Sequence, residues 1–176
     1  HSDLFSGSVA VASGQVMERD MDRALDAALE QVDPGRRSIL HLVPLQYHLD
    51  DARGVKSPVG MFGETLGLDL GVVTVEPPHL RNLSMAIERA HLGTAGFVVA
   101  PYAAAKSVLV EDELTLGVTL IDMGGATTSF AIFHEGHLVF ADVIPIGGMH
   151  ITNDIARGLS TTIAHAERMK TLWGSA

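Results

Sequence analysis

The chain has 176 residues, of which 47% are hydrophobic and 19% charged, a composition typical of a globular protein with one or two small cores. Its 12 basic and 21 acidic residues give a formal charge of -9 without a Lys/Arg cluster, so we expect no nucleic-acid partner. The absence of cysteine excludes disulfide scaffolds and thiolate zinc sites.

The first part of the chain predicts a small α+β unit. Its patterns predict a strand over Ser8–Ala12, a helix over Glu18–Val32, and strands over Ser38–Val43 and Thr65–Val75. The dipeptide Pro77-Pro78 follows as a natural boundary. We therefore predict a strand–helix–strand–strand domain over residues 1–76.

The second part of the chain predicts an α/β arrangement. In order, the patterns predict a helix over Leu80–His91, a buried strand over Gly96–Ala100, a helix over Tyr102–Val110, strands over Gly117–Met123, Thr127–His134 and His137–Pro145, and helices over Thr152–Leu159 and His165–Leu172. The longest apolar run, Ala95–Ala105, is too short for a bilayer, which takes about 20 residues. No secretory signal opens the chain.

A glycine-rich turn between two predicted strands is the strongest chemical signal. Asp122 ends an apolar strand, Gly124-Gly125-Ala126 form the turn, and Thr127-Thr128 open the next strand. Glycine lets backbone amides approach an anion closely, and the threonines add donors. Asp122 is placed to hold Mg²⁺ through water, which hard cations favour. The alternative is an ordinary β-hairpin with a flexible turn.

Two later features favour the phosphate-binding interpretation. Gly147-Gly148 lie where a strand gives way to a helix, so their amides would face the same side as the hairpin turn. Glu167 and Lys170 stand three residues apart on one helix face, where both could reach one ligand. The alternative for that pair is a surface salt bridge of a few tenths of a kcal/mol.

In this order the three features resemble the actin-like ATPase fold of actin, heat-shock chaperone ATPases, sugar kinases and bacterial actin relatives. Asp122–Thr128 resembles the second phosphate loop, and Gly147-Gly148 resemble the glycines that open the next nucleotide-facing helix. The resemblance implies that Glu167 contacts the ribose hydroxyls and that Lys170 is its companion. It implies ATP and Mg²⁺ as cofactors, bound by Asp122, Gly124, Gly125, Ala126, Thr127, Thr128, Gly147, Gly148, Glu167 and Lys170.

Within this superfamily the chain is similar to the FtsA family of bacterial cell-division proteins. The strings that carry the similarity, in family order, are His41–Pro44 with Tyr47, Gly54–Met61, Ser107–Glu113, Leu116–Val118, Val143–Pro145, Thr152–Ala156 and Ala166-Glu167. The resemblance implies a mixed α/β (α+β) fold. Residues 1–76 would be an inserted strand–helix–strand–strand interaction domain, 77–115 the end of a first actin-like (ribonuclease H-like) lobe, and 116–176 the start of a second.

The resemblance also implies a role in assembly. Family members bind ATP, polymerise head to tail and tether the tubulin-like FtsZ ring to the inner membrane. For this chain it implies three kinds of partner, which are FtsZ, other subunits of the same protein, and later division proteins contacted through residues 1–76. The implied location is the cytoplasmic face of the membrane and the septum, with membrane contact only through a segment outside these residues.

Two positions depart from the expected patterns. Ala126 replaces the usual third glycine of the phosphate loop, and its methyl group fits if φ stays negative. Ala100 precedes Pro101 where heat-shock ATPases place the glutamate that activates the attacking water. We therefore expect ATP binding with weak or no hydrolysis and assign no catalytic residue.

The string Asp69–Thr74 resembles the first phosphate loop of the superfamily, in a place where the family commonly has a histidine-containing strand. We interpret it as a strand, because Pro77-Pro78 and a helix follow it, and because 122 − 69 = 53 residues leave no room for the lobe between the two loops. The chain would then be a fragment with one side of a nucleotide site. We expect it to bind nucleotide weakly or not at all.

Three other functions stay open. A pilus-assembly actin relative carries the same kind of insertion, although the Gly54–Met61 string argues against it. An ATP-hydrolysing chaperone-like or sugar-kinase relative would need the carboxylate that Ala100 lacks. In a pure interaction module only residues 1–76 would be functional. A metal site at His134 and His137 is less favoured than two exposed turn residues, because no third ligand lies nearby.

Overall fold

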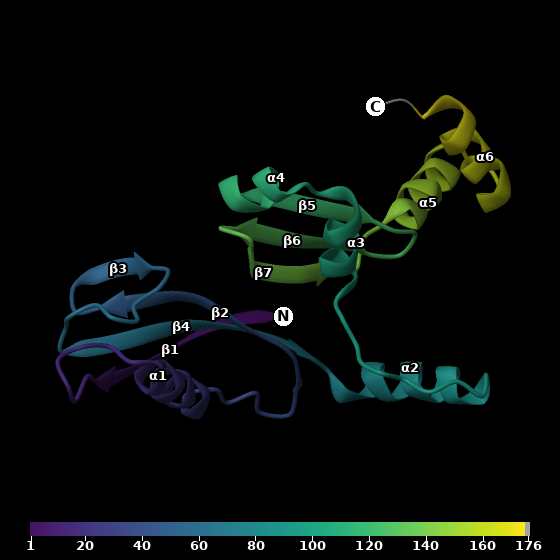
Figure 1. Ribbon diagram of the computed structural model, residues 1–176. Helices are drawn as coiled ribbons and strands as arrows, with labels where there is room; N and C mark the ends of the chain where they lie inside the picture. The colour runs from purple at the N-terminus through teal and green to yellow at the C-terminus, as the bar shows by residue number, and fades with distance from the viewer. Residues whose placement is uncertain (175–176) are drawn as a thin grey trace.

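The computed structural model describes residues 1–174, so Ser175 and Ala176 of the predicted second lobe lie outside the described residues. The elements, shown in Figure 1, are β1 (Ser2–Ala10), α1 (Glu18–Glu30), β2 (Ser38–Leu49), β3 (Ala52–Val55), β4 (Thr65–Val75), α2 (Pro77–Arg89), α3 (Ala100–Val108), α4 (Glu111–Leu116), β5 (Val118–Met123), β6 (Thr128–His134), β7 (His137–Ile144), α5 (Gly148–Gly158) and α6 (Ile163–Trp173). The fold is mixed α/β, with two antiparallel sheets.

The first sheet has the strand order β1-β4-β2-β3, and every neighbouring pair is antiparallel. The central strand, β4, points Leu66, Leu68, Leu70 and Val72 at one face, as the two-residue period of a strand requires. Helix α1 covers that face and buries Ala24 and Ala28 completely. This strand–helix–strand–strand unit therefore closes its own hydrophobic core.

The contact between α1 and β1 depends on Gly7. A Cβ atom at that position would lie 2.1 Å from the backbone nitrogen of Ala28. Backbone cannot retreat as a flexible side chain can, so a larger residue would force the helix away from the sheet. Gly7 and the alanines of α1 together set this close approach.

The second sheet is the meander β5-β6-β7. Its core residues Leu120, Phe133 and Leu138 pack with Ala105 of α3 and with Val73 from the other face of the first sheet. Polar contacts add to this packing: the Ser2 hydroxyl donates to the Ala141 carbonyl at 2.6 Å and accepts from its amide at 2.9 Å. The open face of the first sheet is thus covered by the second.

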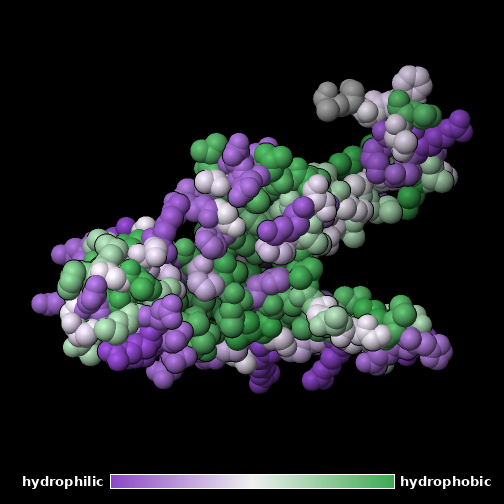
Figure 2. All heavy atoms as spheres, in the orientation of Figure 1, coloured by the Kyte–Doolittle hydropathy of each residue, from purple (hydrophilic) through white to green (hydrophobic). Residues whose placement is uncertain are grey.

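Two helical arms project from these sheets, one formed by α2 and the other by α5 and α6 (Figure 1). Helix α2 has no buried residue, although its sequence is amphipathic. Leu83 and Met85 are about half exposed. Figure 2 shows apolar residues along the side of α2 that faces the other arm and polar residues along the opposite side.

The predicted strand over Gly96–Ala100 is wrong. The segment before α3 is extended, but no neighbouring strand among the described residues pairs with it, so it cannot form a ladder. Val98 is exposed, and Val99 donates its amide to Nε2 of His41 at 3.1 Å. Burial lowers the pKa of His41, which suits a neutral ring that accepts this bond.

Several boundaries also differ from prediction. Strand β1 begins at Ser2 rather than at Ser8, because the polar residues before Ser8 also pair with β4. Strand β2 continues through Pro44 with a register shift that tolerates the missing donor. Two elements were not predicted. Helix α4 is short and begins with three acidic residues, and strand β3 is polar and gave no apolar pattern in the sequence. Helices α3 and α5 begin earlier than predicted, at Ala100 and Gly148.

Two other interpretations are confirmed. Asp69-Leu70-Gly71 lies in the middle of β4 rather than in a loop, and the Asp69 carboxylate accepts hydrogen bonds from Ser6 and Gln46. His134 and His137 are exposed and face each other across the β6–β7 turn. Among residues 1–174, no helix has the length and apolar character needed to cross a membrane.

Candidate functional site

The predicted phosphate hairpin is a tight turn between β5 and β6. Asp122 pairs with Ser129 and Met123 with Thr128, and the Gly124 amide closes the turn on the Thr127 carbonyl at 2.8 Å. Ala126 has no positive φ, so its methyl group adds no backbone strain. The alanine that replaces the family's third glycine is therefore compatible with the turn.

The amides at the tip of this turn are free. Within the described part of the chain, the backbone N–H groups of Gly125, Ala126 and Thr127 donate to no protein acceptor. All three residues are exposed, and a Cβ atom at Gly125 would touch nothing within 4 Å. Neighbouring free amides are donors that favour anions. The hairpin thus has the donors that a phosphate needs.

The two threonines of the hairpin differ in their surroundings. Thr127 is exposed beside the free amides. Thr128 is buried, and its hydroxyl donates to the Ile146 carbonyl at 2.7 Å, which ties the hairpin to the segment before α5. The geometry gives Thr128 a positioning role, while direct contact of its side chain with nucleotide stays a prediction.

Asp122 is exposed and is the last residue but one of β5, next to the turn. Among the described residues, no group of three or more His, Asp or Glu side chains could hold a metal ion. A single carboxylate is nevertheless compatible with Mg²⁺, which keeps several waters and takes its remaining ligands from phosphates. The residues present therefore fit Mg²⁺ held through water at Asp122.

The start of α5 lies directly against the hairpin. The Gly148 amide donates to the Gly124 carbonyl at 2.9 Å, and the Met149 amide donates to the Gly125 carbonyl at 2.7 Å. A Cβ atom on Gly147 would come within 2.5 Å of the Gly124 oxygen, so only glycine permits this approach. The helix end fixes the hairpin through these amides, and its dipole favours negative charge there.

Glu167 and Lys170 meet α5 through Thr152, which is fully buried. The Thr152 hydroxyl donates to Oε2 of Glu167, and Lys170 Nζ lies 2.8 Å from the same oxygen. Lys170 Nζ also donates to the Gly148 carbonyl at 3.1 Å. The structure therefore brings this predicted pair to the helix end that contacts the hairpin.

The remaining carboxylate oxygen of Glu167 is available. Among the described residues, Oε1 accepts no hydrogen bond, and about half of the side chain is exposed. Hydrogen bonds from Lys170 and then Thr152 hold the pKa of Glu167 below its usual range. A charged carboxylate with a free oxygen is compatible with contact to ribose hydroxyls, the role that the family resemblance implies.

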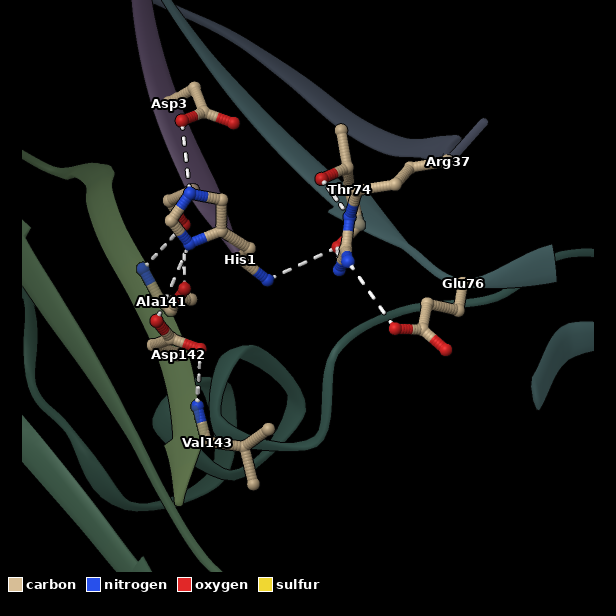
Figure 3. A network of polar contacts seen from close by, with 9 residues as sticks. His1, Asp3, Arg37, Thr74, Glu76, Ala141, Asp142 and Val143 are labelled. Carbon is tan, nitrogen blue, oxygen red and sulfur yellow. Dashed lines mark hydrogen bonds and ion pairs between the residues drawn. The ribbon is translucent and has the colours of Figure 1, made fainter. Parts of the chain in front are cut away.

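A cleft of about 530 Å³ reaches this site from the first sheet. Its lining brings Ala100 and Pro101 together with Thr127 of the hairpin. Ala100 supplies no carboxylate. Figure 3 shows the charged groups near the cleft, with Glu76 lying 3.7 Å from Arg37 and Asp142 lying 3.6 Å from His1. Both carboxylates in this lining are thus held by basic side chains.

Sequence reasoning missed two contributors, Thr152 and His150. Thr152 is four residues beyond Gly148, so its hydroxyl oxygen lies 3.1 Å from the Gly148 carbonyl while its single proton is shared with Glu167. His150 is the third residue after Gly147, and its Nδ1 accepts the Gly147 amide at 3.1 Å. The spacing of an N-cap and its third helical residue could have indicated the latter contact.

The strand–helix–strand–strand unit and the hairpin locked against α5 define an actin-like protein with an inserted domain. The family model described as "SHS2 domain inserted in FTSA" matches residues 1–74, and the model "Cell division protein FtsA" matches residues 119–176. Together they match most of the chain. The chain belongs to the FtsA family of cell-division proteins.

Individual relatives agree with this family. The chain is 46% identical over 175 residues to the cell division protein FtsA of Agrobacterium fabrum, covering 99% of this chain and 40% of the relative. It is 40% identical to that of Pseudomonas aeruginosa over 93% of this chain and 39% of the relative. For Bacillus subtilis the identity is 36%, over 97% of this chain and 39% of the relative. The chain thus spans about 40% of the length of these relatives.

A solved structure supports the fold alone. The chain aligns with the PilM-PilN type IV pilus biogenesis complex at a TM-score of 0.58 and 18% identity, covering 98% of this chain and 48% of that chain. Such low identity transfers no activity. The pilus alternative therefore shares the architecture, whereas the family models match the cell-division proteins.

Proposed function

We propose that the hairpin is one wall of an ATP–Mg²⁺ site in an actin-like cell-division scaffold. The observation that carries the proposal is the row of free amides at Gly125, Ala126 and Thr127, held in place by the start of α5. Asp122 would hold Mg²⁺ through water, and Glu167 would face the ribose hydroxyls. The metal supplies charge neutralisation for the phosphates.

Nucleotide in this scaffold acts through assembly. Position 100 carries a methyl group, so this chain offers no general base there, and we infer weak or no ATP hydrolysis. Membership of the FtsA family supports a division partner for the assembled form. The proposed partners are FtsZ, further copies of the same protein, and later division proteins that contact the inserted domain, which we place at residues 1–76.

The proposed location is the inner face of the cell membrane at the septum. We propose that attachment comes from a segment outside these residues. We assign residues 77–115 to the end of the first actin-like lobe and residues 116–176 to the start of the second. The two helical arms would then belong to different lobes of the same protein.

Binding of ATP by the protein in its natural full length tests the proposal. Gly125→Asp places a negative charge among the free amides without a steric clash, since nothing lies within 4 Å of its added Cβ. We expect ATP affinity to fall at least about 100-fold, because a carboxylate repels the phosphates. The matched control is Gly93→Asp, which adds the same charge at another open glycine and should change affinity little.

Equal ATP affinity in the Gly125→Asp variant and the unaltered protein would contradict the proposal. Mg²⁺ dependence gives a second test at the same site. Asp122→Asn should weaken ATP binding in the presence of Mg²⁺ by about tenfold while changing metal-free binding little. Turnover near that of a chaperone ATPase would instead favour the hydrolysing alternative.

A further inference from the structure

The first turn of α5 has a capping contact made by a histidine. Gly147 is the N-cap residue, and its amide donates to Nδ1 of His150 at 3.1 Å, while the His150 amide donates back to the Gly147 carbonyl at 2.9 Å. The side-chain contact is one half of a capping box, in which the third helical residue usually supplies Glu or Gln, and the glycine N-cap has no side chain to supply the other half. Here an imidazole ring supplies the acceptor.

The acceptor fixes the chemical state of the ring. Nδ1 can accept a hydrogen bond only when it carries no proton, so the proton of a neutral His150 must reside on Nε2. A protonated imidazole has two donors and no acceptor. Protonation would therefore leave the Gly147 amide without this partner and turn an N–H group toward it.

The capped glycine touches the hairpin directly. Its position is confined by Gly124 and Gly125, whose atoms would lie within 2.8 Å of a Cβ on Gly147. The next two amides, of Gly148 and Met149, hold the turn carbonyls. A change in the cap at Gly147 thus reaches the free amides of the hairpin through two consecutive backbone contacts.

The charged groups on α5, on α6 and on the hairpin do not take over the role of the His150 ring. On α5, Asp154 lies one turn beyond His150, and strand β5 of the hairpin carries Asp122. On α6, Glu167 and Lys170 are engaged with each other. Within residues 1–174, none of the acidic side chains forms an ion pair with His150.

We propose that His150 is a positioning residue which, as the Nε2-protonated neutral tautomer, sets the start of α5 against the hairpin and so supports nucleotide affinity. The inference rests on the proposed function, because it concerns positioning at the same site.

The test compares three variants in the protein at its natural full length. His150→Ala removes the acceptor and should weaken ATP binding about fivefold at neutral pH. His150→Gln keeps an acceptor for the Gly147 amide and should restore near-normal affinity. His137→Ala, at the far turn of the second sheet, is the matched control and should bind like the unaltered protein.

Rescue by glutamine separates positioning from simple structural support, because His150→Gln keeps the acceptor for the Gly147 amide and His150→Ala does not. Equal affinity of His150→Ala and the unaltered protein, or equal loss in His150→Ala and His150→Gln, would overturn the inference while leaving the proposed function intact.

Nuclear magnetic resonance checks the contact without nucleotide. The ring ¹⁵N shifts should report the Nε2-protonated tautomer at neutral pH, and the Gly147 amide should exchange faster in His150→Ala than in His150→Gln. A ring protonated on Nδ1 would overturn the inference. Absence of ATP binding by the unaltered protein at every pH would instead refute the proposed function on which it rests.

Discussion

The inserted domain and the hairpin region reach order by different means. In the former, α1 and β4 bury Leu66, Leu68, Leu70 and Val72 almost completely. In the latter, backbone hydrogen bonds between the hairpin and α5 carry the geometry, and apolar residues such as Ile121 and Met123 remain exposed. Apolar burial is therefore concentrated in the domain proposed for partner contact, and the proposed nucleotide site lies in the region with less burial.

This difference has a consequence for dynamics. Elements with few buried apolar contacts open locally at low free-energy cost. The α2 arm has no buried residue, and in the α5–α6 arm Ala156 and Ala166 are the buried apolar residues. We therefore expect these arms to exchange amide hydrogens faster than β4, and to gain order when other surfaces cover them.

The largest expected effect is a loss of folding stability when the core of the inserted domain is altered. Leu68→Ala removes a completely buried side chain from β4 and should lower the free energy of unfolding by about 2–5 kcal/mol. Leu116→Ala, on a residue that is 81% exposed, should change it by no more than about 0.5 kcal/mol. Urea unfolding of the 176-residue chain measures both free energies. Similar losses in the two variants would contradict the claim that burial in the inserted domain carries more stability than the exposed residue does.

A smaller effect is expected from the polar face of the same sheet. Asp69 is buried and accepts hydrogen bonds from Ser6 and Gln46, with His48 Nε2 at 2.7 Å from its carboxylate. Asp69→Ala leaves these groups unpaired and should cost about 1–3 kcal/mol. Asp26→Ala, on the exposed side of α1, is the control and should cost little.

The pH dependence of Asp69 sharpens this prediction. Burial alone would raise the pKa of the carboxyl, but hydrogen bonds from Ser6, Gln46 and His48 outweigh it and hold the pKa below its usual value. The folded state thus binds this proton less tightly than the unfolded state. The resulting stability is present above the unfolded pKa, about 4, and is lost as pH falls through the lower folded pKa. Asp69→Asn should remove that acid loss.

The smallest effect is expected at Glu167. Its lowered pKa, caused by Lys170 and Thr152, means that the contact between α5 and α6 should weaken as pH falls through the folded pKa of the carboxyl. Amide exchange in α6 should show this acid-induced loosening in the unaltered chain and not in Glu167→Gln. Glu88→Gln on α2 is the control. Unchanged acid sensitivity in Glu167→Gln would show that the pair does not hold the two helices.

Much of this arrangement could be predicted from local sequence patterns. The hairpin at Asp122 and the glycine pair at Gly147 carry their chemistry in consecutive residues, so the sequence indicated both. The strand at Gly96–Ala100 was wrong because strand formation needs a neighbour, which no local pattern guarantees. The buried Thr152 and the capping His150 became visible only when α5 met α6 and the hairpin.

The inserted domain gives the converse case. The alternation in β4 predicted a strand, but its position at the centre of the sheet, between β1 and β2, depends on long-range pairing. Edge strand β3 is short and polar, so its sequence gives little signal. Pairing order and edge strands are therefore the features that sequence alone left undetermined.

Calorimetric titration with ATP and Mg²⁺ tests the central claim most directly, by comparing the 176-residue chain with the protein in its natural full length. The 176-residue chain, which supplies one wall of the site, should show no measurable binding at micromolar ATP. The full-length protein should bind ATP, and the Gly125→Asp variant of that protein should lose the binding. Micromolar affinity in the 176-residue chain alone would contradict the account of the hairpin as one side of a shared site.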